Sequence, residues 1–268
     1  LAISSTYQGL PVIDGVTQFL VGARCLLAYR DFQQRAVMKC DVTDQQKVDY
    51  WKRQLQDCDY VSESLASELL RDFGIPMIQS LEVSSIDELQ TAVLNVGFPL
   101  VLKTAVQGID HKTEVGGVIL NISDQRQLQD AYEDLLQRLG LAVTVAPMAD
   151  NNGVEMILGI SRDEQFGPTV VVGFGGVYAE ILSDVAVMLP PFDSAEVKRV
   201  LKSLSMYPLL EGVRGGSPLD IDSFCDVAAK MSAIALALSD SVVEIDINPV
   251  RLGVKGCIGL DALVVLER

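Results

Sequence analysis

The chain has 268 residues, of which 49% are hydrophobic and 21% charged, a composition typical of a globular protein with a sizeable core. Its 21 basic and 36 acidic residues give a net charge of −15, and such a field repels nucleic acid and anionic membranes, which argues against both as partners. No apolar run reaches the roughly 20 residues that span a bilayer, and the N-terminus lacks a signal-peptide pattern, so we expect a soluble, cytoplasmic protein.

The five cysteines and the single histidine argue against a zinc site. No two cysteines have the close spacing of a metal-binding or redox pair, and their odd number and scatter fit reduced thiols of the cytosol. The first residue is leucine rather than methionine, so we expect a segment of a longer polypeptide or a trimmed chain.

Residues 1–60 carry the weakest pattern in the chain. Apolar spacing predicts a helix over residues 16–29, whereas residues 41–60 are polar and show no strong period. We therefore interpret residues 1–60 as the end of a preceding module followed by a linker.

From Ser62 onwards, helices and strands alternate, with capping residues and glycine or proline stops at their ends; Ser85 and Glu88 form a capping box for the second of these helices. In a first lobe, helices are predicted over 62–73, 85–96 and 128–139, and strands over 98–103, 117–122 and 141–147. A polar turn at 149–153 opens a second lobe, with strands at 154–160, 168–174, 242–250 and 257–265 and helices near 194–204 and 222–238. Hairpin-like neighbours among helices predict an α+β fold of two α/β-type lobes with partly antiparallel sheets.

The C-terminal hairpin is predicted to gather polar side chains on one face. Alternation along a strand directs three side chains to the core: Val243, Ile245 and Ile247. Three others share the opposite face: Glu244, Asp246 and Asn248. We expect Pro249 to end this strand. With the turn centred on Val254 and Lys255, Asn248 lies opposite Asp261, and the Cβ atoms of such a pair are about 5 Å apart.

Asp246, Asn248 and Asp261 would then form an all-oxygen cluster, the ligand type that Mg²⁺ prefers. Asp261 is also the one acid in an otherwise apolar strand. The pattern alone fits a solvated acidic face of the sheet equally well.

Three further residues have an ordinary and a functional interpretation. Lys103 ends an apolar strand, where a lysine either reaches solvent or binds phosphate at the mouth of a cleft. Glu155 points away from the core, so it is either an exposed strand residue or a contact for a ribose or a phosphate-bound metal. His111, the single histidine, lies in the polar stretch GIDHKTEVGG, and the residues around it leave its role open.

The glycine-rich stretch at residues 172–176 predicts a turn or a close backbone approach rather than a dinucleotide site. Tyr178 stands where the third glycine of GxGxxG belongs, and the chain has no Walker motif and no GxSxG elbow.

Several motifs, in this order along the chain, resemble the ATP-grasp domain of NDP-forming (ADP-forming) acyl-CoA synthetases, relatives of the succinyl-CoA synthetase β chain. They are FPLVLK, HKTEVGGV, GVEMILGISRDEQFGP, GFGGVYAEILSD, LLEGVRG, and EIDINPV followed by LDA. The segment GLPVIDGVTQFLVGARCLLAYRDF resembles the end of the CoA-ligase portion that precedes this domain in fused members. The resemblance implies a CoA-ligase-like end and linker at 1–60, an N-terminal ATP-grasp subdomain at 61–148 and a C-terminal one at 149–268.

The resemblance also implies roles, residue by residue, around ATP held between the two subdomains. ATP-binding positions are Lys103, Lys112, Gly116, Gly117, Glu155 and Arg214. The Mg²⁺-proximal positions are Asp246, Asn248 and Asp261, in agreement with the hairpin argument. At the hinge, Ala146 and Pro147 stand where the family often has a polar residue, so adenine recognition there would rely on backbone groups.

Members of the family make an acyl-CoA from a carboxylic acid, coenzyme A and ATP, and they release ADP and phosphate. The resemblance implies that His111 is catalytic as a phosphoryl carrier, because neutral imidazole is nucleophilic near neutral pH and its phosphoramidate donates onward. ATP, Mg²⁺ and the CoA-ligase portion of the same or a partner chain are the implied partners, and the full-length protein is expected to be an oligomer. This segment alone is predicted to bind ATP without completing the reaction.

Two alternatives remain open at this point. One is a regulatory nucleotide- or acyl-CoA-sensing domain of a protein acetyltransferase, against which the retained Lys103, His111 and Asp261 argue. The other is an ATP-grasp ligase with an amine nucleophile, which needs no histidine in this loop.

Overall fold

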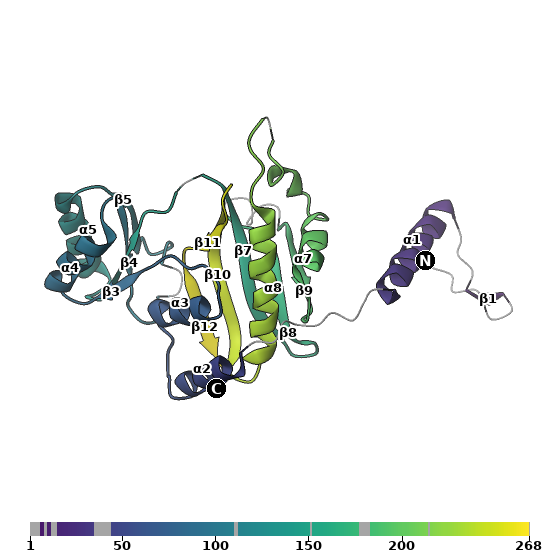
Figure 1. Cartoon of the computed structure of the whole chain (residues 1–268), viewed down its shortest axis with the longest axis horizontal. Helices are drawn as coiled ribbons and strands as arrows, with labels where there is room; N and C mark the ends of the chain where they lie inside the picture. The colour runs from purple at the N-terminus through teal and green to yellow at the C-terminus, as the bar shows by residue number, and fades with distance from the viewer. Residues whose placement is uncertain are drawn as a thin grey trace. The chain divides into compact units, whose positions relative to one another are not determined.

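The computed structural model describes residues 6–7, 10–11, 15–34, 44–109, 112–150, 152–176, 183–213 and 215–267. The chain forms two compact units, Leu1–Met38 and Lys39–Arg268 (Figure 1). In the first unit, strands β1 (Thr6–Tyr7) and β2 (Leu10–Pro11) pair antiparallel, and helix α1 (Val16–Gln33) confirms the helix predicted from residue 16. None of the described helices is both long and apolar enough to cross a membrane.

Helix α2 (Gln45–Gln56) opens the second unit, in a stretch where the sequence pattern predicts no helix. Its buried residues Val48, Trp51 and Leu55 have helical spacing, but they form a narrow stripe in an otherwise polar segment. Asp44 caps the helix by accepting a hydrogen bond from the Gln46 backbone N–H at 3.0 Å. Trp51 fixes α2 to the rest of the unit, because its indole Nε1 donates to the carboxylate of Asp72 at 2.9 Å.

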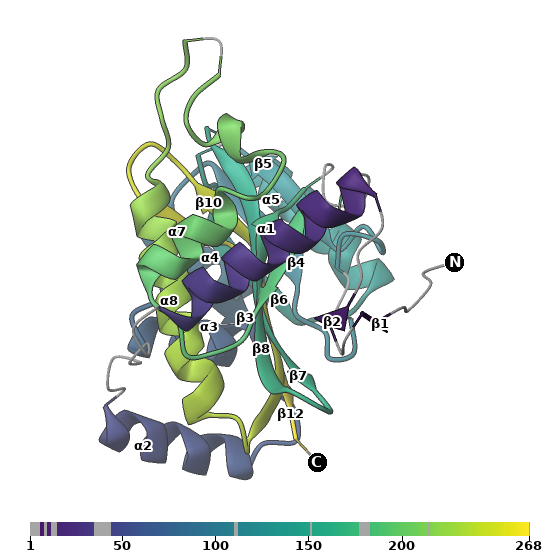
Figure 2. The same ribbon diagram turned by 90° about the vertical axis from the view of Figure 1, so that its right-hand side faces the viewer.

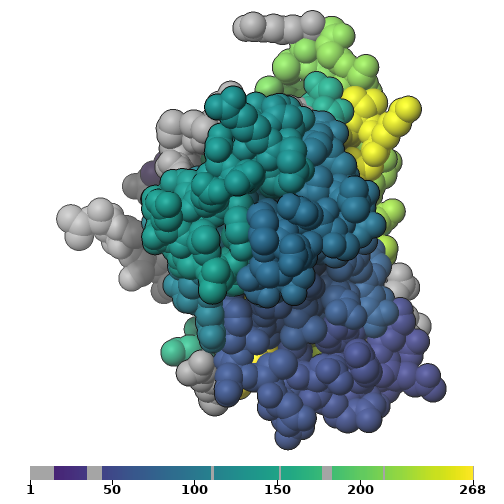
Figure 3. All heavy atoms as spheres, turned by 90° about the vertical axis from the view of Figure 1, so that its left-hand side faces the viewer, coloured from purple at the N-terminus to yellow at the C-terminus, as the bar shows by residue number. Residues whose placement is uncertain are grey.

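The first sheet of this unit is antiparallel, with strand order β3-β6-β4-β5. Its strands are β3 (Leu81–Val83), β4 (Leu100–Thr104), β5 (Val118–Ile122) and β6 (Val143–Pro147). Helices α4 (Ile86–Val96) and α5 (Gln125–Arg138) share one hydrophobic core with it, and they lie toward the viewer in the upper part of Figure 3, in blue and teal. The predicted N-cap is confirmed, since the Glu88 N–H donates to Ser85 Oγ at 3.3 Å, and the Glu88 carboxylate accepts from the N–H of Ser84, the residue before the N-cap, at 2.8 Å.

The second sheet is also antiparallel, with strand order β11-β10-β7-β8-β9, and β12 pairs with β10 as well. Its strands are β7 (Val154–Asp163), β8 (Gly167–Phe174), β9 (Val185–Met188), β10 (Val242–Leu252), β11 (Cys257–Gly259) and β12 (Ala262–Leu266). Helices α7 (Ser194–Leu201) and α8 (Ile221–Ala237) lie side by side over one face of this sheet (Figure 2). A short 3-10 helix, η1 (Tyr207–Leu209), lies between them in sequence. The opposite face is left for the site described below.

Helix α3 (Glu63–Asp72) precedes the first sheet in sequence but packs against β12 of the second sheet. The chain that follows it stays with that sheet, since Gly259 donates its N–H to Pro76 O at 2.8 Å and accepts from the Ile78 N–H at 2.9 Å. The N-terminus of α3 is therefore placed beside the C-terminal hairpin. The subdomain boundaries at residues 60 and 148 stay predictions.

Candidate functional site

The C-terminal hairpin has the predicted register. Val250 pairs with Gly259 and Ile247 with Ala262, and between these pairs the Asn248 N–H donates to Asp261 O at 3.3 Å. Asn248 therefore lies opposite Asp261, as expected from a turn centred on residues 254 and 255.

Two details of the hairpin prediction are wrong. Pro249 does not end the strand: β10 continues to Leu252, because its pairing with β7 shifts between Ile247 and Val250 and the irregularity accommodates the missing N–H. A second register shift near the start of β10 buries Val242 and leaves Val243 only partly buried. Beyond that shift the alternation holds, with Ile245 and Ile247 in the core.

A cavity of about 560 Å³ lies at the free face of the second sheet and is lined from both lobes. Five predicted site residues line it: Lys112, Glu155, Asp246, Asn248 and Asp261. Lys103 lies behind this lining, within 3.3 Å of the Asp261 carboxylate. His111 and Arg214 lie outside the described residues.

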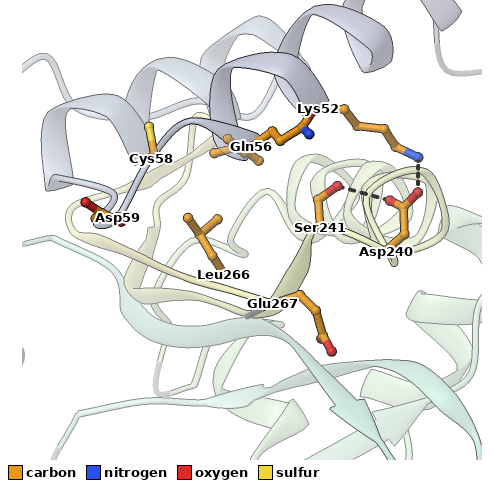
Figure 4. Close-up of a pocket in the computed structure, with 9 residues that line it drawn as sticks. Lys52, Gln56, Cys58, Asp59, Asp240, Ser241, Leu266 and Glu267 are labelled. Carbon is orange, nitrogen blue, oxygen red and sulfur yellow. Dashed lines mark hydrogen bonds and ion pairs between the residues drawn. The ribbon is translucent and has the colours of Figure 1, made fainter.

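A second cavity, of about 810 Å³, lies between the end of α2 and the end of β12. It contains none of the predicted site residues, and its lysine, Lys52, already pairs with Asp240 at 2.7 Å, which also accepts from the Ser241 hydroxyl at 3.1 Å (Figure 4). The smaller cavity is lined by side chains of the kinds that bind phosphate and metal ions, a lysine and several oxygen donors, so we take it as the candidate functional site.

Two lysines and two carboxylates form a closed ring at the edge of the smaller cavity, which we call the charge ring: Glu63, Lys103, Lys112 and Asp261. Glu63 bridges the lysines, because its Oε1 accepts from Lys103 Nζ at 3.1 Å and its Oε2 from Lys112 Nζ at 2.8 Å. Asp261 bridges them again, with Oδ2 at 3.3 Å from Lys103 Nζ and Oδ1 at 3.2 Å from Lys112 Nζ. The ring thus joins both lobes and carries no net charge.

Lys103 is held inside the protein rather than extended to solvent. It is 8% exposed, and the interruption between β11 and β12 lets Leu260 O accept a hydrogen bond from its Nζ at 2.8 Å. The interpretation of Lys103 as a solvent-directed strand end is therefore wrong. A buried ammonium needs such partners, since desolvation without them is costly.

Lys112 is the lysine of the charge ring that lines the cavity, beside the ring carboxylates Glu63 and Asp261. Burial lowers the pKa of its ammonium, but the negative charges of Asp261 and Glu63 outweigh this, so the pKa stands above its ordinary value of 10.5. Lys112 is therefore a permanent cation at physiological pH.

Gly116 and Gly117 shape the loop that follows Lys112. The Gly117 N–H donates to Lys112 O at 2.7 Å and the Gly116 N–H to Thr113 O at 3.1 Å, so both amides are used within the loop. A Cβ on Gly117 would lie 2.7 Å from Thr104 Cγ2, which requires glycine there. In this conformation the two glycines fold the loop against β4 rather than offering amides to the cavity.

Glu155 is fixed by Arg251, its cross-strand neighbour on β10, whose Nη2 donates to Glu155 Oε1 at 2.8 Å. The glycine-rich stretch approaches from the other side: the Gly175 N–H donates to Glu155 O at 2.7 Å, and a Cβ on Gly176 would lie 2.5 Å from Glu155 Oε2. The predicted close backbone approach of this stretch is confirmed. Glu155 is at the same time one of the residues that line the cavity.

The donor set at the hairpin suits a hard divalent cation. Within the described part of the chain, no cluster of three or more His, Cys, Asp or Glu side chains forms a metal site by itself. Asp246, Asn248 and Asp261 supply two carboxylates and an amide, and Mg²⁺ ordinarily completes such partial oxygen sets with phosphate oxygens and water. Gly159 on β7 pairs with Asp246, and a Cβ there would lie 3.0 Å from the Ile245 carbonyl oxygen, a tight contact that favours glycine.

Two residues of this site have no recognisable signal in the sequence. Glu63 looks like an ordinary acidic residue in the first turn of a helix, and Arg251 like an exposed strand residue. Their roles depend on contacts with residues 40 and 96 positions away, Lys103 and Glu155. Only the pairing of β10 with β7 and the packing of α3 on β12 bring them into place.

Two lobes of helices and antiparallel strands, with two lysines of one lobe paired to the acidic hairpin of the other at the edge of a cavity, are typical of the ATP-grasp class of fold. Residues 54–266 match the ATP-grasp domain family.

Three similar proteins indicate to which family of ATP-grasp domains the chain belongs. The β subunit of ADP-forming acetate–CoA ligase I from Pyrococcus furiosus is 33% identical over 214 residues, which span 76% of this chain and 90% of that subunit. A trans-feruloyl-CoA synthase from a prokaryote of unknown identity is 35% identical over 217 residues, and the match spans 78% of this chain but 31% of that protein. The structure of dinucleotide-forming acetyl-coenzyme A synthetase 1 from Ca. Korarchaeum cryptofilum, in complex with coenzyme A and Mg-AMPPCP, is 31% identical, with a TM-score of 0.71 over 82% of this chain and 100% of that one. The chain belongs to the ATP-grasp domain family of ADP-forming acyl-CoA synthetases.

Proposed function

We propose that this chain is the nucleotide-binding segment of an ADP-forming acyl-CoA synthetase, which joins a carboxylic acid to coenzyme A at the expense of ATP. The observation that carries the proposal is the cavity at which Lys112 and, behind it, Lys103 meet the oxygen donors of the hairpin. The complexes of the Korarchaeum relative with coenzyme A and Mg-AMPPCP support the same ligands for the full-length protein.

In this proposal the lysines bind the phosphates of ATP, with Gly116 and Gly117 holding the loop that carries Lys112. Asp246, Asn248 and Asp261 hold Mg²⁺, which when bound offsets negative charge on the transferring phosphoryl group. Glu155, oriented by Arg251, accepts hydrogen bonds from the nucleotide. Arg214 is proposed as a further anion contact from its sequence motif alone.

His111 is proposed as the phosphoryl carrier. It directly precedes Lys112 in the chain, and Lys112 Nζ lies at the cavity within 3.2 Å of Asp261. A neutral imidazole nitrogen would attack the γ-phosphorus of ATP, and the bond from that phosphorus to the bridging oxygen would break, releasing ADP. A phosphohistidine segment pointing towards the nucleotide site is described for the Korarchaeum relative.

The remaining steps would take place on parts of the protein outside this chain. We propose that the CoA-ligase portion, in the same or a partner chain, receives the phosphoryl group and forms the acyl phosphate and then the thioester. An oligomeric full-length protein and a cytoplasmic location belong to the same proposal. The alternative of an acetyltransferase regulatory module has no support among the relatives named above, which are all synthases or ligases.

The test is transfer of label from γ-labelled ATP to the full-length protein. We expect acid-labile label in the wild type, its loss or strong reduction in His111→Ala, and unchanged binding of Mg-AMPPCP in that variant. Label that persists undiminished in His111→Ala would refute the carrier role. Failure of the wild type to bind Mg-AMPPCP would refute the nucleotide site itself.

A further inference from the structure

The charge ring neutralises the two cations that a nucleotide would need. Each lysine already contacts two carboxylates, Glu63 and Asp261, at distances between 2.8 and 3.3 Å. A metal-free polyphosphate would therefore meet a cavity with no free positive charge at this ring, in a chain whose net charge is −15. Its binding requires that phosphate oxygens compete with both carboxylates at once.

The two carboxylates differ in what can release them. Asp261 lies on the hairpin beside Asn248 and is a proposed Mg²⁺ ligand, so a metal ion can draw it away from the lysines. Glu63 has no such second partner: it is 9% exposed, held in the first turn of α3, and directed at the lysines by both of its oxygens. Asp261 also accepts the Ala262 N–H at 2.9 Å, a hydrogen bond that keeps it on the hairpin, so we take Asp261 as the exchangeable carboxylate and Glu63 as the one that stays on the lysines.

The placement of Glu63 is not explained by helix capping. Ser62 fills the N-cap position, with its Oγ accepting from the Leu65 N–H at 3.3 Å, so the Glu63 carboxylate is not needed to satisfy that end of the helix. It extends instead to Lys103 on β4 and to Lys112 in the loop after it, both of the other lobe.

We propose that Glu63 is a specificity-determining residue that restricts the cavity to metal-loaded nucleotide, an inference that rests on the proposed function. With Mg²⁺ on Asp261, phosphate oxygens replace one carboxylate on the lysines, and Glu63 keeps the two ammonium groups side by side. Without the metal, both carboxylates stay in place and exclude the polyphosphate.

The experiment is isothermal titration of the full-length protein with AMPPCP, with Mg²⁺ and with EDTA. The measured quantity is the ratio of the two dissociation constants. In Glu63→Gln, which keeps the shape and removes the charge, we expect metal-free AMPPCP to bind about tenfold more tightly, the effect of removing one close charge pair, while the Mg²⁺-loaded affinity changes less. Glu82→Gln is the control, because Glu82 is an exposed carboxylate that lines the same cavity from β3. It should leave the ratio at the wild-type value.

Thermal unfolding would show whether Glu63→Gln folds. If it does not fold, Glu63→Asp is used in its place. Its shorter side chain draws the charge back from the lysines, so its ratio should lie between those of the wild type and of Glu63→Gln. A wild-type ratio in Glu63→Gln, or an equal change in Glu82→Gln, would overturn the inference and leave the proposed function standing. A wild type that binds neither form would overturn both.

Discussion

Replacement of Lys103 by methionine tests the energetic importance of the charge ring. Methionine has nearly the volume of the lysine stem, so the change removes the ammonium with little loss of packing. It leaves Glu63, which is 9% exposed, with Lys112 as its remaining cation, and it leaves Leu260 O without the hydrogen bond that Lys103 Nζ donates.

The size of the effect follows from the distances. At an effective dielectric constant of about 20, an ion pair at 3.1 Å has a gross Coulomb attraction of about 5 kcal/mol. Desolvation of both groups offsets part of it, and Lys112 still compensates Glu63. We therefore expect a loss of about 2–3 kcal/mol, below the ~3–5 kcal/mol for a buried charge left with no partner. The thermal midpoint should fall by about 4–10 °C.

The assay is thermal unfolding of the variant beside Lys198→Met as a matched control. Lys198 pairs with Asp222 at 2.6 Å on the exposed surfaces of α7 and α8, where water and salt screen the pair, so its loss should leave the midpoint almost unchanged. In a Glu63→Gln background, Lys103→Met should cost less than in the wild type, since the carboxylate that it strands is gone. Equal midpoints for Lys103→Met and Lys198→Met would refute the reasoning.

Three further predictions concern the loop, the ring and a buried thiol. Gly117→Ala should destabilise the protein by about 1–3 kcal/mol, because its Cβ would lie 2.7 Å from Thr104 Cγ2, whereas Gly253→Ala, whose nearest neighbour would be 3.7 Å away, should be nearly neutral in the same denaturant titration. Burial lowers the pKa of Lys112, but Asp261 and Glu63 raise it more, so its folded-state pKa lies above its unfolded-state pKa. The stability that Lys112 contributes should therefore be constant below the unfolded-state pKa and decline as the pH rises through the folded-state pKa. If the difference in unfolding free energy between the wild type and Lys112→Gln declined between pH 7 and 9, this prediction would be wrong. Burial raises the pKa of Cys225 to about 12, whereas Cys25 is exposed. At pH 8 iodoacetamide should therefore label Cys25 in the native protein and Cys225 only after unfolding, which peptide mass spectrometry would show. Equal labelling of both cysteines in the native protein would count against the burial of Cys225.

The parts of the fold that depend on local patterns were predictable. The turn position alone placed Asn248 opposite Asp261, and the Ser85–Glu88 pair placed the start of α4. Helix α2 was missed because Val48, Trp51 and Leu55 are its sole buried residues in a polar segment.

The electrostatics of the site were not predictable in the same way. The strand-end position of Lys103 leaves its role open and the family resemblance supplies it, but its ion-pair partner Glu63 lies 40 positions earlier on a helix that packs against the other sheet. The place of Gly116 and Gly117 at the ATP site stays a prediction; the hydrogen bond of the Gly117 amide to Lys112 O at 2.7 Å is a feature that the sequence pattern does not predict. Such features arise from tertiary contacts, which periodicity and capping signals do not encode.

The path of helix α3 limits where this protein can be cut. Because α3 and the strand-like segment at Met77 and Ile78 cover β12 and bridge to Gly259, the second lobe is completed by residues that precede the first lobe in sequence. A fragment that begins at the hinge near residue 149 would contain every strand of the second sheet and still expose the surface under α3. A truncation or a circular permutation must therefore keep α3 with the second sheet. The first sheet can be separated from it only by cutting the chain twice, between α3 and β3 and again after β6.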